Sequence, residues 1–305
     1  MRLLVPVKSL EEVKILIEKG ADALYCGYIE DNKSYSAWDY EEANFEDWSE
    51  FKKAIKLSNN KKIPIYCNLD IHKIHNQDEL ENILERTQKI NKLGISGFIV
   101  ANISLLFSLK KLGFKIILSR HTGVVNPSAV RFFNNYGFCN IMLTEHLYAS
   151  EIKILKDSSK NTRFYLPMWG IECPTNNIYC LLEQALHWEG FTTGCNVPAK
   201  KTIVSRVKQE ISTKKDIFKN IDFDSKFRNR CYLCRLYELK NIDYLVIIGT
   251  YFNTKQKIEA VQNLKFLIKK LNTVTKNDFT LLCHNIIKKK GIDCKSQRCR
   301  HYEEQ

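Results

Sequence analysis

The sequence predicts an α/β protein built as a (β/α)8 TIM-like barrel, and three observations support this fold class. Helical segments alternate with short strands, eight such strands can be counted, and each strand is apolar along nearly its whole length. Strands that are buried on both faces of a parallel sheet have this continuous apolar character. Eight parallel units favour a closed barrel over an open sheet.

One unit recurs along the chain, and it consists of an amphipathic helix, a turn and a short strand. The unit is clearest at residues 11–27 and 83–102. Gly20, Gly94 and Gly137 stand where the helix of a copy should end. That position favours a left-handed backbone, which glycine adopts most easily.

The expected strands follow the chain in order, with one interruption before the last of them. They are residues 3–7, 23–26, 63–69, 97–100, 115–119, 140–144, 163–167 and 244–248. Between the seventh and eighth strands, residues 168–242 contain five cysteines and no clear strand. We therefore expect one barrel domain at 1–272 that includes a Cys-rich cap at 168–242. A helical, cysteine-containing C-terminal tail is expected at 273–305.

The composition restricts the class of protein and the kinds of partner. The net charge is +13, from 47 Lys and Arg against 34 Asp and Glu. This charge is compatible with RNA or another polyanion, and equally with a background rich in lysine. Apolar segments are too short and interrupted for membrane insertion, and the N-terminus lacks the apolar run of a secretion signal. We expect a soluble, cytoplasmic protein.

The 11 cysteines are concentrated in the last part of the chain, where eight follow residue 172. Cys173, Cys180 and Cys195 are widely spaced, whereas Cys231 and Cys234 form a CxxC pair. Four converging thiolates can hold either zinc or an iron–sulfur cluster. Structural zinc is usually held by two such knuckles and only one is present, so a cluster fits better and zinc is the alternative. Buried, unreactive thiols are the plainer interpretation.

The other six cysteines include Cys26, which ends a strand and could be either a core or a site residue. Cys67, Cys139 and Cys283 lie in strand or helix patterns and are expected in the core. Cys294 and Cys299 could form a second metal half-site or cover the first.

Several segments resemble the collagenase-like peptidases, which are peptidase family U32. The opening MRLLVPVKSLEEVKILIEKGADALYCG resembles the family's first strand, its Ser-Leu-Glu helix start and its GADAVYLG segment. The similarity continues at 93–113, 126–153, 169–180, 194–201 and 234–250. The resemblance implies a TIM-like barrel, in agreement with the strand count.

The resemblance also implies a chemistry. Related proteins take part in anaerobic ubiquinone hydroxylation and in hydroxylation of tRNA or ribosomal RNA, with prephenate as oxygen donor. Members acting on ubiquinone carry a 4Fe-4S cluster, whose ligands match Cys173, Cys180, Cys195 and Cys234 here, with Cys231 as the alternative fourth ligand. An Fe–S enzyme for oxygen-independent hydroxylation is expected, acting on a small aromatic molecule or RNA. The alternatives are a peptidase, or a non-catalytic Fe–S subunit with a paralogous partner.

Candidate catalytic residues stand at the ends of the fifth and sixth strands. Glu145 matches a family acid and could act as general base, or it could be a charge at the start of the next helix. Arg120 and His121 could bind a carboxylate or phosphate, although at least one of them is expected on the surface.

Candidate substrate-binding residues stand at three other strand ends. Trp169 could stack on an aromatic substrate or seal the barrel. Asn102 could orient substrate or cap the next helix, and Asp70 follows the third strand. Where relatives have His-Gly and Ser-Thr-Gln, this chain has Trp169-Gly170 and Ser119-Arg120-His121. These departures predict a different substrate.

Overall fold

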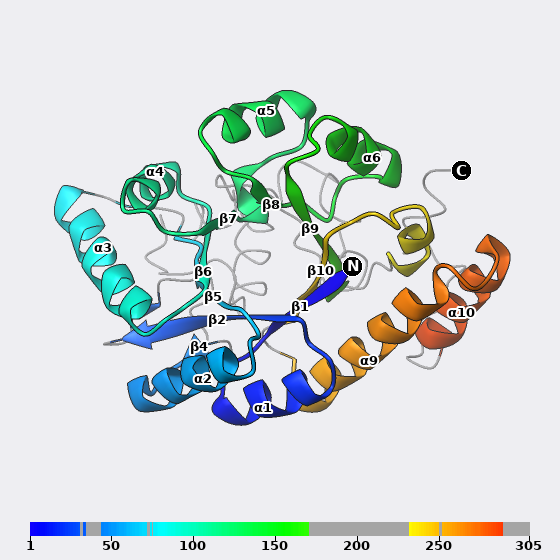
Figure 1. Ribbon diagram of the computed structural model, residues 1–305, viewed down its shortest axis with the longest axis horizontal. Coiled ribbons are helices and arrows are strands. Elements are labelled where there is room, and N and C mark those ends of the chain that lie inside the picture. Colours follow the sequence, from blue (N-terminus) through cyan, green and yellow to red (C-terminus); the bar gives the residue numbers. More distant parts are fainter. Residues whose placement is uncertain are drawn as a thin grey trace, which may run out of the picture.

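The computed structural model describes residues 1–30, 33–34, 44–71, 74, 76–170, 232–249 and 252–288. Eight parallel strands form the barrel (Figure 1), and β1 closes it by pairing with both β10 and β2. These strands are β1 (Arg2–Pro6), β2 (Ala23–Glu30), β5 (Ile65–Leu69), β6 (Gly97–Val100), β7 (Ile116–Leu118), β8 (Asn140–Met142), β9 (Arg163–Gly170) and β10 (Tyr244–Ile248).

The predicted fold is confirmed, since each expected strand is a strand of the barrel. β9 continues to Gly170, into the segment where the cap was expected to begin. Two short strands, β3 (Lys33–Ser34) and β4 (Asn44–Phe45), pair with the extended end of β2 and were not expected.

Helices surround the barrel, as the ribbon in Figure 1 shows. Six of them begin at a Ser, Asp or Asn whose side chain accepts a hydrogen bond from the first turn. The helices are α1 (Leu10–Glu18), α2 (Trp48–Asn60), α3 (Gln77–Lys92), α4 (Ile103–Lys111), α5 (Pro127–Asn135), α6 (Ala149–Asp157), α9 (Thr254–Lys270) and α10 (Lys276–Lys288). Two 3-10 turns also matter for the site, η2 (Arg120–Thr122) and η3 (Leu233–Tyr237).

The glycines expected at helix ends have the predicted left-handed backbone. The φ angles of Gly20, Gly94 and Gly137 are +102°, +88° and +78°. At Gly94 a side chain would also collide, because a Cβ atom would lie 2.9 Å from Nδ2 of Asn59. The same Asn59 amide donates a hydrogen bond to the carbonyl of Gly94. Both the backbone and the contact therefore require glycine there.

The interior of the barrel is filled by large side chains. Tyr165 and Tyr244 stack with 4.4 Å between ring centroids, and Arg2 donates a hydrogen bond of 3.0 Å to the Tyr244 hydroxyl. Burial raises the pKa of Tyr165 and of Tyr66. The other members of this inner cluster are Leu4, Ala23, Tyr25, Ile99, Ile117, Met142 and Val246. TIM barrels are packed cores of this kind, not pores.

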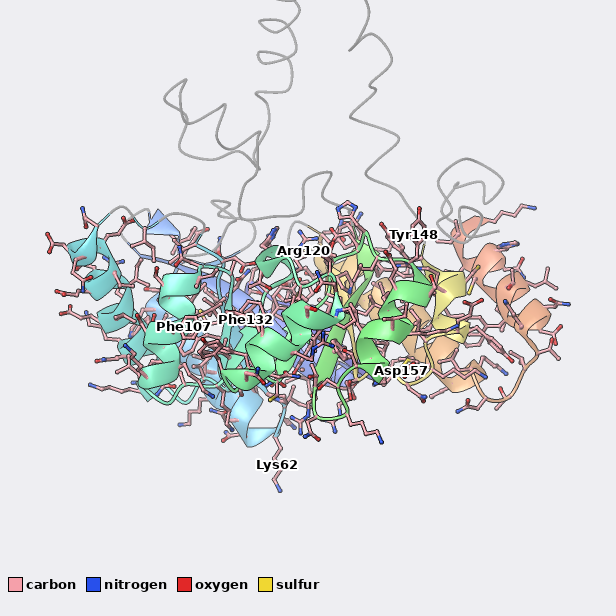
Figure 2. All side chains as sticks on the ribbon, turned by 90° about the horizontal axis from the view of Figure 1, so that it is seen from above. Lys62, Phe107, Arg120, Phe132, Tyr148 and Asp157 are labelled. Carbon is pink, nitrogen blue, oxygen red and sulfur yellow. The ribbon has the colours of Figure 1, made fainter. Side chains whose placement is uncertain are left out.

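The two rims of the barrel carry different parts of the chain. Arg120, just beyond β7, lies at one rim, whereas Lys62, in the turn before β5, lies at the other (Figure 2). We call the Arg120 rim the mouth, because the parallel strands all end there. In the described ranges, no helix combines the length and the apolar character needed to cross a bilayer.

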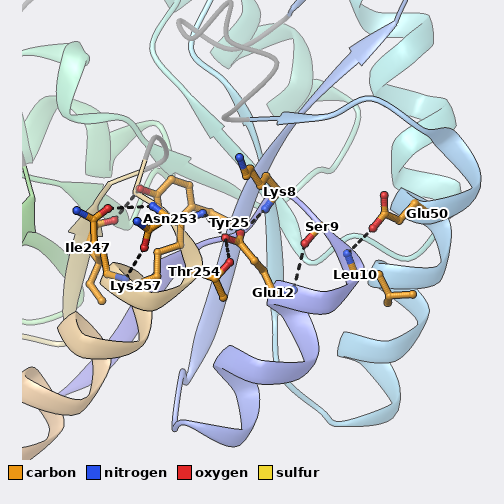
Figure 3. A network of polar contacts seen from close by, with 11 residues as sticks. Lys8, Ser9, Leu10, Glu12, Tyr25, Glu50, Ile247, Asn253, Thr254 and Lys257 are labelled. Atoms are coloured by element: carbon orange, nitrogen blue, oxygen red, sulfur yellow. Dashed lines mark hydrogen bonds and ion pairs between the residues drawn. The ribbon is translucent and has the colours of Figure 1, made fainter.

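A buried ion pair joins the first and last helices of the ring (Figure 3). Lys257 of α9 is fully buried, and its Nζ lies 2.7 and 3.0 Å from the two carboxylate oxygens of Glu12 on α1. The same carboxylate accepts hydrogen bonds from the Thr254 hydroxyl and the Lys8 backbone amide. Burial lowers the pKa of Lys257, and Glu12 opposes this effect. The pair therefore ties the closing unit of the barrel to the opening one.

We expect Lys257→Met to reduce the free energy of unfolding by about 3–5 kcal/mol, because the Glu12 charge stays buried without its partner. The double variant Glu12→Gln/Lys257→Met should recover most of that loss. Lys265→Met is the matched control: Lys265 is also on α9 and lies 2.7 Å from Asp22, but both side chains are about one-third exposed. The control should lose only about 0–1 kcal/mol. Urea unfolding measures all three, and equal losses in the two single variants would contradict the role of the buried pair.

Candidate functional site at the barrel mouth

A buried carboxylate, hydroxyl and imidazole meet at the mouth. The Ser119 hydroxyl donates a hydrogen bond of 2.6 Å to Oδ2 of Asp70, and Nε2 of His121 lies 4.0 Å from the same oxygen. Asp70 follows β5, and its backbone amide donates a hydrogen bond to the side-chain oxygen of Asn68. Asp70, Ser119 and His121 are at most 6% exposed. The ends of β5 and β7 thus supply a hydrogen-bonded Ser119–Asp70 pair with the His121 imidazole nearby.

The local chain direction explains why Ser119, Arg120 and His121 all face inward. β7 ends at Leu118, and the chain then tightens into η2, with the Ser119 hydroxyl accepting the backbone amide of His121. Gly123 ends the turn with φ at +71°. The expectation that Arg120 or His121 lies on the surface is wrong, since both are buried. A 3-10 turn directly after a strand was not visible in the hydrophobic pattern.

Glu145 and Arg120 form an ion pair within the same rim. Arg120 Nη1 donates to Oε1 of Glu145, and Glu145 is only 1% exposed. Glu145 is not a helix-start charge: α6 begins at Ala149, and the acid of its first turn is Glu151. The pair places opposite charges side by side in a region where little water can screen them.

Beside this ion pair lies a small, open pocket with mainly apolar walls. Its empty space is about 200 Å³, including the part open to solvent, and Glu145 contributes to its wall. Trp169 is half-buried, packs against the core and also faces this pocket. Both roles weighed for Trp169 are therefore compatible with its position. The remaining lining residues are Pro167, Met168, Gly170, Tyr232 and Ile248.

The backbone at this pocket tolerates no side chain at Gly170. A Cβ atom there would lie 1.6 Å from the carbonyl oxygen of Ile248, because β9 and β10 approach closely at this point. The strand pairing shifts register just before it, between Val246 and Ile247. The Trp169-Gly170 dipeptide is thus held in place by a strand irregularity.

Asn102 acts as a helix cap at the end of β6. Its side-chain oxygen accepts the backbone amide of Leu105 at 3.2 Å, at the first turn of α4. This geometry matches the capping alternative considered for Asn102.

The chain segment that leads into β10 connects the mouth to the outer helices. Arg235 of η3 is fully buried and donates to the backbone carbonyl of Leu147, between β8 and α6. Its guanidinium also lies 4.6 Å from the ring centroid of Tyr232, which lines the pocket. Sequence reasoning missed Arg235, since an isolated Arg in CRLYEL carries no local signal of burial.

Only one of the expected metal ligands lies in the part of the chain that the structure describes. Cys173, Cys180, Cys195 and Cys231 lie outside it, as do Cys294 and Cys299. Within the described ranges, no group of three or more His, Cys, Asp or Glu side chains could hold a metal ion.

The described candidate ligand is Cys234, a buried residue of η3. A hydrogen bond from Cys283 of α10 lowers the pKa of the Cys234 thiol, although burial opposes this. The prediction that Cys283 is buried is confirmed, but its contact with Cys234 was missed. That contact depends on how η3 and α10 pack, which spacing along the chain does not reveal.

Three possible nucleophiles of the described residues are too deeply buried to attack a peptide. Burial raises the pKa of Cys26 well above its ordinary value and that of Cys67 to about 12. A thiol of this kind is a poor nucleophile, because the thiolate is the reactive form. The Ser119 hydroxyl donates a hydrogen bond to Asp70 but is fully buried, so a peptide bond has no access to it in this arrangement. Peptide cleavage by these groups is therefore not supported by their geometry.

Comparison with known proteins gives a consistent family assignment. The family model described as Peptidase family U32 matches residues 8–290. Among solved structures, the U32 peptidase Mk0906 is similar with a TM-score of 0.53 at 12% identity, covering 81% of this chain and 92% of that one. At this identity the structural similarity concerns the fold alone.

Two curated proteins are similar over about half of the chain. An uncharacterized protease, MJ0090 of Methanocaldococcus jannaschii, is 24% identical over 56% of this chain and 40% of its own length. The tRNA hydroxylation protein P1 of Bacillus subtilis is 27% identical over 51% of this chain and 35% of its own length. The match thus spans well under half of each relative.

We expect Ser119→Ala to reduce the free energy of unfolding by about 1.5–3 kcal/mol, because it removes a hydrogen bond to a buried carboxylate. Ser58→Ala is the matched control, since Ser58 is also fully buried and donates a bond of 2.6 Å, but to the neutral carbonyl of Ile63. The control should lose about 0.5–1.5 kcal/mol. Urea unfolding at neutral pH compares them, and a larger loss in the control would contradict a charged Asp70.

Proposed function

Because the chain belongs to peptidase family U32, we propose that it is an oxygen-independent hydroxylation enzyme that modifies a nucleobase of RNA at the barrel mouth. The observation that carries this proposal is the buried polar group at the strand ends, in which Arg120 pairs with Glu145 and Ser119 with Asp70. Burying these charged groups is costly for folding unless they are paired, and such clusters are frequent at functional sites.

The pocket beside Glu145 suits a flat heteroaromatic ring. The half-buried indole of Trp169 offers a stacking surface, and the carboxylate of Glu145 offers an acceptor for ring N–H groups. The pocket is shallow and open, so we propose that one base lies against its wall while the rest of the substrate stays outside. A base that projects from a single-stranded or flipped nucleotide meets this requirement.

The other pair of the mouth is suited to proton transfer. The carboxylate of Asp70 accepts a hydrogen bond from the Ser119 hydroxyl and lies 4.0 Å from Nε2 of His121. An imidazole beside a carboxylate can take up or release a proton during a reaction. We assign His121 the proton-handling role, and Arg120 with Glu145 the binding of substrate or oxygen donor.

We further propose a 4Fe-4S cluster held by Cys173, Cys180, Cys195 and Cys234, with Cys231 as the alternative fourth ligand. Cys234 fits this role, because the hydrogen bond from Cys283 favours the thiolate form that binds iron. Its segment also reaches the pocket, which Tyr232 lines two residues earlier. When bound, such a cluster supplies single electrons at the site. Zinc is the alternative occupant of the same thiolates.

The net reaction must balance without molecular oxygen. One C–H bond of the base is replaced by C–OH, and the C–OH bond of an organic donor of the prephenate type is replaced by C–H. The base loses two electrons and the donor gains them. Both molecules must therefore reach the mouth.

RNA is favoured as the substrate by two observations. The relative from Bacillus subtilis is described as a tRNA hydroxylation protein, and the chain has a net charge of +13. The name of the other relative, a protease, favours the peptidase alternative. That alternative is weaker, because burial shields the Ser119 hydroxyl and raises the pKa of the Cys26 and Cys67 thiols.

The cluster is tested by anaerobic purification followed by quantification of iron, sulfide and zinc. We expect about four iron and four sulfide per chain, lost in Cys234→Ser and kept in the control Cys139→Ser. Cys139 is half-buried in the turn before β8. Loss in Cys231→Ser instead would identify the alternative ligand. Zinc without sulfide, or a metal-free folded protein, would contradict the cluster.

Hydroxylation is tested by mass spectrometry of nucleosides from RNA incubated anaerobically with the protein, reductant and prephenate. We expect a nucleoside that gains one oxygen atom, at a rate reduced about 100-fold or more in Glu145→Gln. Glu151→Gln is the control, since Glu151 caps the exposed start of α6. If Glu145→Gln unfolds, Trp169→Ala provides the second variant. Peptide cleavage with no modified nucleoside would favour the peptidase.

A further inference from the structure

One side of the barrel carries a long segment without acidic residues. From Arg86 to Thr144 the sequence contains eight Lys and Arg residues and no Asp or Glu. One of the eight, Arg120, is buried in the mouth and compensated by Glu145, so seven cations lie outside the mouth in this segment. It comprises the end of α3, the strands β6 to β8 and the helices α4 and α5. The positive charge is thus concentrated on one sector instead of being spread evenly.

The outer face of α4 and α5 in this sector carries a row of aromatic rings. The ring of Tyr136 lies 5.1 Å from that of Phe107 and 5.1 Å from that of Phe132, measured between centroids. Phe132 and Tyr136 are 49% and 51% exposed. Figure 2 shows Phe107 and Phe132 on the same outer face, below the rim that carries Arg120.

Exposed cations lie on the same two helices as these rings. Arg131 is exposed on α5, and its Nη2 donates a hydrogen bond of 2.9 Å to the Ser128 hydroxyl. Lys111 is exposed at the end of α4. Lys110 donates a hydrogen bond of 3.0 Å to the carbonyl of Gly137, which fixes the turn that follows Tyr136. The helices that carry the ring row therefore also carry positive charge.

We propose that this surface, formed by Phe107, Lys111, Arg131, Phe132 and Tyr136, docks a single-stranded segment of the RNA substrate. We call it the α4–α5 face. Bases stack on the exposed rings, and phosphates contact the cations. Stacking of bases on aromatic rings within a positively charged surface is the usual means of binding single strands without sequence preference. This inference rests on the proposed function, because it supplies the docking surface for the same RNA.

The charge pattern favours RNA over a protein partner. The acid-free segment extends well beyond the rings, to Lys89 and Lys92 on α3 and to Lys115 before β7. An extended polyanion such as RNA matches an extended positive sector. A protein interface, in contrast, requires a compact patch whose charged residues are confined to its rim.

The position of the face suits a substrate whose modified base enters the mouth. η2 ends beside the buried site, and α5 begins at Pro127, a few residues later. At 1.5 Å per residue along a helix, Phe132 lies on the order of 8 Å from the start of α5. Tyr136 and Lys111 lie farther along, at the C-terminal ends of α5 and α4, so the RNA would run along the outside of the barrel up to the rim.

RNA binding is measured by fluorescence anisotropy of a labelled, mixed-sequence, single-stranded oligoribonucleotide added to the full chain, at several KCl concentrations. We expect Phe132→Ala/Tyr136→Ala to weaken binding about tenfold or more without changing the salt dependence. Lys111→Ala/Arg131→Ala should weaken binding and reduce the slope of log Kd against log salt by about 1.4. Phe266→Ala is the matched control, because Phe266 on α9 is 41% exposed and has Lys270 5.9 Å from its ring centroid. The control should bind as wild type.

Several results would overturn the α4–α5 face as an RNA surface. These are no RNA binding by the wild type, unchanged binding in the ring variant, or an equal loss in Phe266→Ala. Sedimentation provides a further criterion: if the ring substitutions convert a dimer to a monomer and leave RNA binding intact, the face binds a second copy. RNA bound through this face with no nucleoside gaining oxygen would retain the docking surface and reject hydroxylation. If the ring variant makes modified nucleosides as well as the wild type does, hydroxylation is retained and the α4–α5 face is rejected as the docking surface.

Discussion

Closure of the barrel between its first and last strands is the constraint on which the remaining structure depends. β1 pairs with β2 on one side and with β10 on the other, and the buried Glu12–Lys257 pair holds α1 and α9 together at the same seam. The side chains of the site come from β5, β7, β8 and β9. These strand ends face a common centre only in a closed ring, so a contact outside the site controls its geometry.

Within the mouth, charge pairing and hydrogen bonding both hold the side chains of the site in one arrangement. The charges of Arg120 and Glu145 compensate each other, and their burial means that neither has to be stripped of much water when a ligand arrives. Ser119 links Asp70 to the η2 turn through its hydroxyl, so the carboxylate and the turn keep one relative position. A site organised in this way has little freedom to adapt to different ligands. Its selectivity therefore depends on the apolar wall around Trp169.

The fold could be predicted from the sequence because its signals are local. The continuous apolar strands and the helix-ending glycines depend on neighbouring residues, and Gly94 has the φ angle that its place predicted. The inward orientation of Arg120 and His121 could not be predicted, because it results from the η2 turn and from partners on other strands. The contact of Cys234 with Cys283 depends in the same way on the packing of η3 against α10. For Asn102 the sequence offered two roles, and the capping role is the local one that the structure shows.

The stacked tyrosines inside the barrel determine how a substrate can enter and leave. Tyr165 and Tyr244 fill the interior below the mouth, so the barrel resembles a cup with a closed base. Whatever enters must leave by the same opening. A polymer cannot be threaded through the barrel and can present only one unit at a time. The order in which substrates bind and products leave at the mouth is therefore part of the reaction.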